Sequence, residues 1–343
     1  MDPSSQMGET EGNVTITDMT GRTITIPNNV QKVMSTSPTI TAMVYMLNPH
    51  KLAGLNYQWT DYEREYVDSE YQNLPIIGGW FGTQEGNYEE IISYEPDIII
   101  QDIRGIGDLA MLMDRQEKFG TFPVVGVIDN LDIAEIEYSI DFVGKMIGEE
   151  AKANKLVDLT HKYLDKANTV SSSIPDSEKK RVYYVRENEG LGTAPKGSVH
   201  TQIVELVGGN NVVDLQTQNN LLSRVDVSME QVIEWDPEII ITVDKSFYET
   251  VYTDPRWSNI KAVKEKQVYL SPQSPFKWID KPFGANTVLG ILWTGKVIYP
   301  EKYSDIDLKE EVKSFYKEYY HYDLSDEEVK DMLESSGLKE ENM

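Results

Sequence analysis

Cysteine is absent from the 343 residues of the chain. Its absence excludes disulfides, thiolate zinc sites, iron–sulfur clusters and cysteine nucleophiles. The chain also lacks an apolar run of 18 residues, so we expect no membrane-spanning helix. No Walker loop, G-x-S-x-G or G-x-G-x-x-G motif occurs. The sequence therefore offers no catalytic motif, and we predict that the protein is not an enzyme.

Basic residues are few beside acidic ones, 32 against 57, which gives a formal net charge of −25. Such a field repels phosphate backbones, so we expect no nucleic-acid partner. Histidine is also scarce, and the four histidines show no H-x-x-x-H spacing. We predict neither a directly bound metal ion nor a cofactor.

The chain is too long for one comfortable core and fits two domains. Alternating strand and helix patterns predict an α/β fold, with two Rossmann-like α/β lobes, mainly parallel sheets and one long backbone helix between them. The first residues lack the basic and apolar regions of a signal peptide and are expected to be the remnant of a tether. The expected parts are a flexible leader (1–13), an N-terminal α/β lobe (14–132), a linking helical segment (133–172), a C-terminal α/β lobe (180–300) and a C-terminal helical tail (301–343).

Local patterns support this division. Residues 14–33 alternate apolar and polar side chains around Thr20 and Gly21, which predicts a hairpin followed by a buried strand. Residues 35–37 are small hydroxyl residues before Pro38, which predicts a capped helix start. Residues 133–170 contain two glycines and no proline, which predicts a long helix in one or two pieces.

One stretch occurs twice. "NYEEIISYEPDIIIQ" at 87–101 is echoed by "SMEQVIEWDPEIIIT" at 228–242, and we call these two stretches the repeated element. In the shared frame Glu89 aligns with Glu230. Each copy predicts a short helix, a break at proline and a buried strand, once in each lobe.

This organisation resembles the helix-linked class of solute-binding proteins that serve ABC importers of cobalamin, siderophores and haem. The stretches that carry the resemblance are the repeated element, "TDMTGRTITIP", "KGSVHTQIVELVGGNNVVD" and "GILWTGKVIYPE", in that family's order and spacing. The resemblance implies a ligand cleft between the lobes, an extracytoplasmic location with a tether in the native full-length form, and a monomeric receptor. It also implies two partners, a small-molecule metal complex and an ABC importer permease dimer.

In that family one exposed glutamate per lobe docks onto arginines of the permease, and the matching positions are Glu89 and Glu230. Two symmetric carboxylates suit a dimeric partner through charge-assisted pairs. The plainer interpretation is that both are solvated helix residues.

Loops that follow core strands are expected to face the cleft. They carry aromatic rings, which suit a bulky ligand, and cations, which suit its acidic groups. The predicted ligand-binding residues are Tyr57, Trp59, Trp80, Phe81, Arg104, Arg186, His200, Lys277 and Trp278. For the aromatic residues the alternative is core packing, although Trp80 and Phe81 lie between glycines and are hard to bury. For Arg104 and Arg186 the alternative is a salt bridge to a neighbouring acid.

Several functions stay open at this point. The first is a receptor that captures a metal chelate of the iron–siderophore, cobalamin or haem type and delivers it to a permease. The second keeps the receptor role for an oxyanion such as molybdate or tungstate. A third is a surface scavenger without direct permease docking. Enzymes built on the same two-lobed frame need cysteine-bound clusters, which this chain cannot form.

Overall fold

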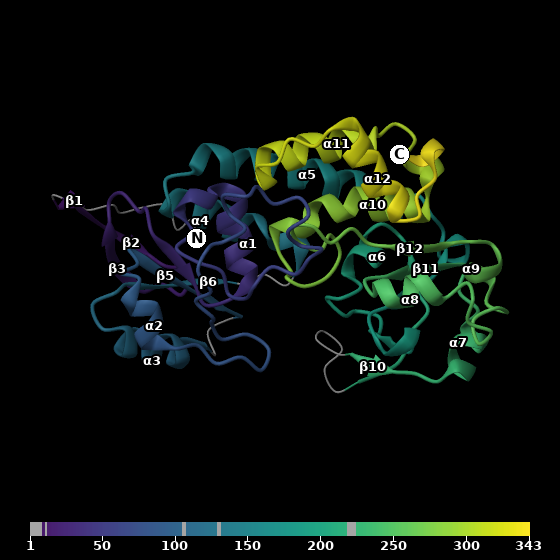
Figure 1. Cartoon of the computed structure of the whole chain (residues 1–343), viewed down its shortest axis with the longest axis horizontal. Coiled ribbons are helices and arrows are strands. Elements are labelled where there is room, and N and C mark those ends of the chain that lie inside the picture. The colour runs from purple at the N-terminus through teal and green to yellow at the C-terminus, as the bar shows by residue number, and fades with distance from the viewer. Residues whose placement is uncertain (1–8, 11, 105–107, 129–131, 218–223) are drawn as a thin grey trace. The chain divides into compact units, whose positions relative to one another are not determined.

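The computed structural model describes residues 9–10, 12–104, 108–128, 132–217 and 224–343 (Figure 1). Contacts divide the chain into two units. Unit 1 runs to Thr160 and includes Tyr319–His321, and unit 2 comprises His161–Glu318 and Tyr322–Met343. The first boundary falls inside helix α5 (Glu150–Ser172), so both units share this helix. The five-part division made from the sequence stays a prediction.

Unit 1 begins with a small antiparallel sheet. Its strands are β1 (Glu9–Thr10), β2 (Asn13–Thr17) and β3 (Thr23–Pro27), in the order β1-β2-β3. The turn between β2 and β3 is held by the buried Asp18 carboxylate, which accepts hydrogen bonds from the backbone and guanidinium of Arg22. The predicted hairpin is confirmed.

The main sheet of unit 1 is parallel, with the order β4-β5-β6. Its strands are β4 (Val33–Ser35), β5 (Ile98–Ile103) and β6 (Val124–Ile128). Its helices are α1 (Pro38–Leu47), α2 (Tyr88–Ser93), α3 (Leu109–Phe119) and α4 (Glu137–Met146). Helices α1 and α4 lie on one face and α2 and α3 on the other (Figure 1). Because both faces are covered, the strands read as nearly continuous apolar runs.

The long helix expected over 133–170 is broken. A short turn (Ile133–Glu135) precedes α4, and the chain then turns before α5. The break is at Gly148, whose φ of 76° lies in the left-handed region that favours glycine. The Glu149 N–H bonds back to the carbonyl of Gly144 at 2.7 Å, which closes the helix end. The helix is therefore in two pieces, one of the two forms expected.

Unit 2 is built on a second parallel sheet with the order β12-β11-β7-β9. Its strands are β7 (Arg181–Val185), β9 (Asn210–Asn211), β11 (Ile239–Thr242) and β12 (Val268–Leu270). A two-stranded antiparallel ribbon joins β8 (Gly192–Thr193) to β10 (Val225–Asp226). The helices are α6 (Gln202–Leu206), α7 (Met229–Trp235), α8 (Lys245–Thr250), α9 (Lys261–Lys264) and α10 (Val288–Ile298). Two α/β units with parallel sheets confirm the predicted fold class.

The C-terminal residues pack onto unit 2 through α11 (Leu308–Phe315) and α12 (Asp326–Ser335), with a π-helical turn (Tyr316–Tyr320) after α11. Short 3-10 turns complete the fold at Pro49–Lys51, Asp176–Glu178, Asn188–Gly190, Ala285–Thr287, Pro300–Tyr303 and Glu340–Asn342. Tyr319–His321 belong to unit 1, where His321 Nε2 lies 2.8 Å from the carbonyl oxygen of Tyr45.

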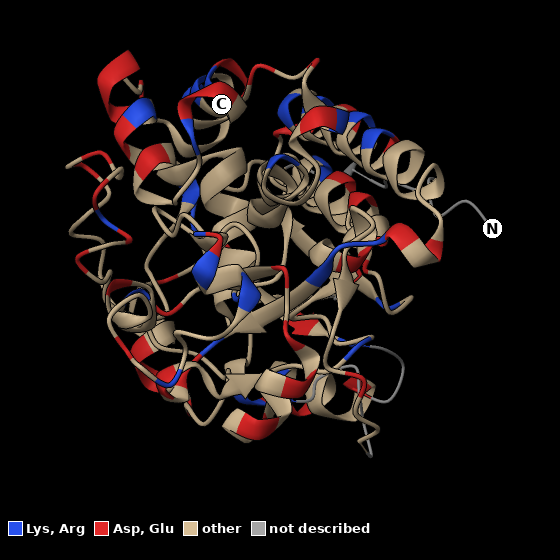
Figure 2. Cartoon of the chain, turned by 90° about the vertical axis from the view of Figure 1, so that its right-hand side faces the viewer, with Lys and Arg blue, Asp and Glu red and all other residues tan. Residues whose placement is uncertain are grey.

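Acidic residues occur on several helices and loops rather than on one element (Figure 2). Among the described residues, no helix combines the length and apolar character needed to cross a bilayer.

Candidate functional site

Both copies of the repeated element form the same capped helix. Glu89 is the second residue of α2 and Glu230 the second residue of α7, and both are exposed. The Asn87 side chain caps α2 and the Ser228 side chain caps α7, each by accepting from the backbone N–H three residues later. Hydrogen bonds from its own N–H and from Ser228 lower the pKa of Glu230, so this carboxylate is charged at neutral pH. The two glutamates therefore occupy equivalent positions in the two units.

The equivalence extends through the turn and into the strand. Glu95 and Asp236 precede the shared proline with φ of 50° and 39°, the left-handed conformation in both copies. After the proline, the Asp97 carboxylate accepts from the N–H of Lys32 at 2.8 Å, and the Glu238 carboxylate accepts from the N–H of Arg181 at 3.1 Å. The repeated sequence therefore encodes one turn that ties its strand to the preceding one.

A buried polar cluster, which we call the Asp280 cluster, lies at the carboxyl end of β7 in unit 2. Asp280 is 1% exposed and accepts from Tyr184 Oη at 2.5 Å, from His200 Nδ1 at 2.8 Å and from the backbone N–H of Lys281 at 2.7 Å. Arg186 Nε lies 3.2 Å from the same carboxylate. The structure thus brings together two residues predicted to bind ligand, Arg186 and His200, through an aspartate that the sequence did not single out.

The cluster fixes the charge of each member. Burial favours the neutral form of Asp280, but the hydrogen bond from His200 and the charge of Arg186 outweigh it and hold the pKa of Asp280 well below its usual range. Burial lowers the pKa of His200, with Asp280 acting in the opposite sense, so the imidazole is neutral at pH 7. An ionised carboxylate only accepts hydrogen bonds, so His200 carries its proton on Nδ1 and keeps a lone pair on Nε2. That Nε2 forms no hydrogen bond with any residue that the structure describes.

Arg186 retains donor capacity. Its side chain is 10% exposed, yet neither Nε nor Nη1 is aligned for a hydrogen bond with a described residue. Buried donors without acceptors are costly, and a guanidinium suits carboxylate and oxyanion acceptors. The salt bridge weighed from the sequence does exist, from Nε to Asp280, but it leaves Nη1 without an acceptor among the described residues.

The loop that supplies Asp280 is rigidly held. The Asn286 side chain donates to the carbonyls of Lys277 and Pro282, and Gly290 lets helix α10 approach the carbonyl of Trp278. Trp278 itself is fully buried, edge-on to Tyr316. The expectation that Trp278 offers its ring to a ligand is therefore not met in this structure, because the ring belongs to the core. Lys277 is half-buried.

Unit 1 carries a different group at its strand ends. Asp102, near the end of β5, accepts from Thr36 Oγ1 at 3.1 Å and from Gln101 Nε2 at 3.2 Å. Burial raises the pKa of Asp102, against the lowering effect of these and other hydrogen bonds. Arg104 follows β5 as predicted, but it is exposed, and its backbone N–H donates to Asp108.

The predicted aromatic residues of unit 1 separate into two groups. Tyr57 and Phe81 are half-buried, with ring centroids 6.3 Å apart, and Tyr57 Oη donates to Glu63. Trp59 is 5% exposed, and its Nε1 donates to a backbone carbonyl, so it is a core residue. Trp80, like Tyr57 and Phe81, is half-buried, so its role as a ligand contact stays a prediction.

The half-buried Trp80 ring packs against the core of unit 1, and a cation covers it. The Arg115 guanidinium lies 3.4 Å from the Trp80 ring centroid, and Tyr88 contacts the same ring at 4.7 Å. Arg115 is itself buried and donates to Gln101 and to Tyr88 Oη. The flanking glycines allow the turn, and the ring keeps part of its surface exposed.

Sequence reasoning missed Asp280, Tyr184 and Asp102, although Tyr184 and Asp102 lie at strand ends. The signal that could have found them is position, since Tyr184 precedes Arg186 by two residues and Asp102 precedes Arg104 by two. Among the described residues no group of three or more His, Asp or Glu is arranged to hold a metal ion.

Comparison with known proteins places this site in context. Residues 33–275 match the family model of the periplasmic binding protein. The molybdate-binding protein MolA of Haemophilus influenzae is 24% identical over 89% of this chain and 90% of its own length. The vitamin B12-binding protein of Salmonella choleraesuis is 24% identical over 56% of this chain and 66% of its own. The structure of an ABC transporter solute-binding protein from Sulfurospirillum deleyianum superposes with a TM-score of 0.84 and 31% identity, covering 93% of this chain and 99% of that one.

Proposed function

The chain belongs to the periplasmic binding protein family of extracytoplasmic transport proteins, and from this premise we propose that it captures a metal chelate of the iron–siderophore, cobalamin or haem type. The bound chelate is delivered to an ABC importer permease. The family and the structural neighbours are substrate-binding transport proteins rather than enzymes.

The Asp280 cluster is the observation that supports this ligand class. It offers a buried guanidinium whose Nη1 has no acceptor, beside a neutral imidazole whose Nε2 keeps its lone pair. Donation from an imidazole Nδ1–H to a carboxylate is the arrangement that orients histidine towards a metal. A chelate offers both matching features, since its acidic groups accept from Arg186 and its metal accepts the lone pair of His200. The metal arrives within the ligand, so the protein needs no complete ligand set of its own.

The alternative ligand is an oxyanion such as molybdate or tungstate. The relative from Haemophilus influenzae is named for molybdate, and Arg186 would serve an oxyanion as well as a chelate. The imidazole discriminates between them. An oxyanion oxygen and the Nε2 lone pair are both acceptors and repel, so the neutral His200 favours a ligand with a metal to offer.

Equilibrium binding tests the proposal directly. Tryptophan fluorescence of the purified protein is followed against ferric citrate, a ferric catecholate siderophore, cyanocobalamin, haemin, molybdate and tungstate. We expect saturable quenching by one class of chelate. No quenching by any chelate, together with tight binding of molybdate, would establish the oxyanion alternative. No quenching by any of the six compounds would reject both ligand classes.

The role of His200 is separated from general folding by a matched pair of variants. His200→Gln removes the metal-directed lone pair, whereas His161→Gln changes an exposed histidine on α5. We expect His200→Gln to weaken chelate binding about tenfold or more and to shift the absorption band of the bound chelate. His161→Gln should leave both unchanged. An unaltered spectrum in His200→Gln, in a protein that still binds, would show that the metal does not touch this residue.

We further propose that Glu89 and Glu230 are the docking contacts for the permease dimer. Their support is the matched position on α2 and α7, their exposure, and the repeated turn that fixes each helix to its sheet. A scavenger without a permease partner would have no use for such a pair.

A further inference from the structure

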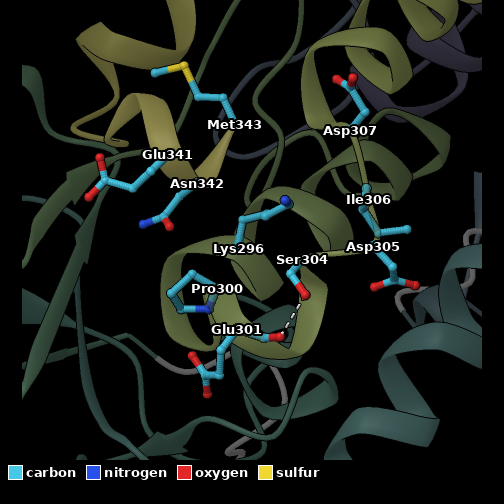
Figure 3. Close-up of a pocket in the computed structure, with 10 residues that line it drawn as sticks. All are labelled: Lys296, Pro300, Glu301, Ser304, Asp305, Ile306, Asp307, Glu341, Asn342 and Met343. Atoms are coloured by element: carbon cyan, nitrogen blue, oxygen red, sulfur yellow. Dashed lines mark hydrogen bonds between the residues drawn. The ribbon is translucent and has the colours of Figure 1, made fainter.

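An open cavity that does not involve the Asp280 cluster lies in unit 2. Its volume is about 540 Å³, and it is lined by the last turn of α10, the segment from Pro300 to Asp307 and the C-terminal residues Glu341–Met343 (Figure 3). None of its lining residues belongs to the Asp280 cluster. Nothing in the proposed function uses this cavity.

The inner wall of the cavity carries one cation, Lys296. Every residue of α10 is buried, and Lys296 is only 4% exposed. Its ammonium points into the space that the other lining residues surround (Figure 3). Across the part of the chain that the structure describes, no hydrogen bond or ion pair engages this Nζ. The charge of Lys296 interacts with Asp307 and Asp305 without a hydrogen bond, so its ammonium presents three donors to whatever fills the cavity.

The carboxylates around the cavity are of two kinds. Asp305 forms an ion pair with Lys166 at 2.6 Å, and Asp307 accepts from the backbone N–H of Glu310 at the start of α11, so both are already engaged. Glu301 and Glu341 also line the cavity, but they are exposed, and neither side-chain carboxylate makes a hydrogen bond or ion pair with a described residue. The cavity therefore has a cation in its wall and two exposed carboxylates at its edge, both directed away from Lys296 in the view of Figure 3.

We propose that this cavity is a second small-molecule site, which binds a zwitterion of the amino-acid class. The ligand carboxylate accepts hydrogen bonds from Lys296, and its ammonium group donates to Glu301 and Glu341. The other ligand classes fit less well. Four carboxylates in the lining repel a polyanion such as phosphate or citrate, and a simple cation meets the charge of Lys296.

Calorimetric titration with a graded set of probes tests the site on the full chain. Glycine, β-alanine and 4-aminobutyrate differ in the separation of their charged groups, while acetate and ethylamine each carry one charge only. We expect one zwitterion to bind at millimolar concentration or tighter and both single-charge probes to bind about tenfold more weakly or worse. No binding by any zwitterion, or equal binding by acetate or ethylamine, would overturn the proposal.

Variants assign the two ends of the ligand. Lys296→Met should reduce zwitterion affinity about tenfold or more, and Lys302→Met, an exposed lysine on the neighbouring turn, should not change it. Because Lys296 is buried, its variant can fail to fold for other reasons. The double variant Glu301→Gln with Glu341→Gln changes only exposed positions and gives an independent answer, since unchanged affinity in this variant contradicts the proposed recognition of the ammonium group.

Discussion

The two units share a scaffold but not the polar groups at their strand ends. The two copies of the repeated element align without gaps through their three isoleucines. Both have a side-chain cap, a left-handed turn and a carboxylate that accepts from the N–H of Lys32 or Arg181 at the start of the neighbouring strand. Beyond them the copies diverge, because Asp102 follows in unit 1 where Val243 follows in unit 2. The difference teaches that the two units share the helix bearing each matched glutamate and the strand behind it, while the polar groups at their strand ends differ.

The buried carboxylates of the two units illustrate that freedom. In unit 2 Asp280 has its pKa held well below the usual range despite burial, because His200 and Arg186 favour its charge. In unit 1 burial dominates, and the pKa of Asp102 is raised. The two buried carboxylates therefore have pKa values shifted in opposite directions, downward for Asp280 and upward for Asp102.

The largest expected effect comes from replacing each carboxylate with its amide. Asp280→Asn removes the acceptor for His200 and the counter-charge of the buried Arg186, so we expect a loss of about 3–5 kcal/mol in the free energy of unfolding. Asp102→Asn keeps an acceptor for Thr36 and removes a charge that burial disfavours, so its effect should be within about 1 kcal/mol. Urea unfolding at pH 7 measures both.

The pH dependence of the same two variants has opposite signs. The depressed pKa of Asp280 means that its carboxylate stabilises the fold above the unfolded value of about 3.9, a contribution lost as the pH falls through the folded pKa below that. The deficit of Asp280→Asn should therefore shrink in acid. The raised pKa of Asp102 means that ionisation opposes folding above it, so Asp102→Asn should gain on the wild type as the pH rises. Parallel pH profiles would contradict the contrast between the units.

A smaller effect is expected where each unit brings a loop close to its scaffold through glycine. A Cβ at Gly290 would lie 1.9 Å from the carbonyl oxygen of Trp278, and a Cβ at Gly79 would lie 2.4 Å from that of Thr36. Gly290→Ala and Gly79→Ala should each cost about 1–3 kcal/mol, because backbone must move. Gly82→Ala is the control for Gly79→Ala, because Gly82 has a positive φ but no atom close to an added Cβ. The free energy of unfolding should fall by only about 1 kcal/mol in Gly82→Ala. Thermal unfolding that ranks Gly82→Ala above Gly79→Ala would contradict the proposed close approach.

The scaffold was predictable from the sequence because it rests on short-range patterns. The hairpin around Thr20 and Gly21, the parallel strands and the helix of each repeated element all follow from periodicity and capping residues within about fifteen positions. The site was predictable only in part. Arg186 and His200 were found from their place after a strand and near a helix start, but Asp280 joins them from about 80 residues away.

The aromatic residues show most clearly where sequence reasoning stops. Trp80 between glycines has the local pattern of an exposed ring, yet Arg115 covers it from helix α3. Trp278 lies in a loop that also carries Lys277 and Lys281, yet this loop packs against α10 and the Trp278 ring is buried. Burial of a ring is decided by partners that are distant in sequence, and no local pattern encodes them.

A still smaller effect separates the two left-handed turns. Glu95 is exposed, and its φ of 50° is unfavourable for a residue with a side chain. No side-chain hydrogen bond with a described residue offsets this strain, so Glu95→Gly should stabilise the protein by about 0.5–1 kcal/mol. Asp236 has the same backbone conformation, but its carboxylate accepts from the N–H of Lys261 at 2.9 Å. Asp236→Gly should therefore gain nothing or destabilise. The urea midpoints of Glu95→Gly and Asp236→Gly test this difference. Equal shifts would show that the hydrogen bond between Asp236 and Lys261 does not stabilise the turn.

The smallest effect on stability, and the sharpest on function, is expected from reversing the charge of the matched glutamates. Glu89→Lys and Glu230→Lys change exposed side chains, so unfolding free energies should stay within about 0.5 kcal/mol and ligand affinity should not change. Binding to the permease in detergent or nanodiscs should fall in each single variant and be lost in the double variant, because each carboxylate registers one half of a dimeric partner. Glu90→Lys and Glu234→Lys, exposed on the same helices, control for net charge. If these controls weaken docking equally, the attraction is a general effect of the acidic surface and the repeated glutamates have no special role; if the double variant still supports uptake, the protein acts as a scavenger.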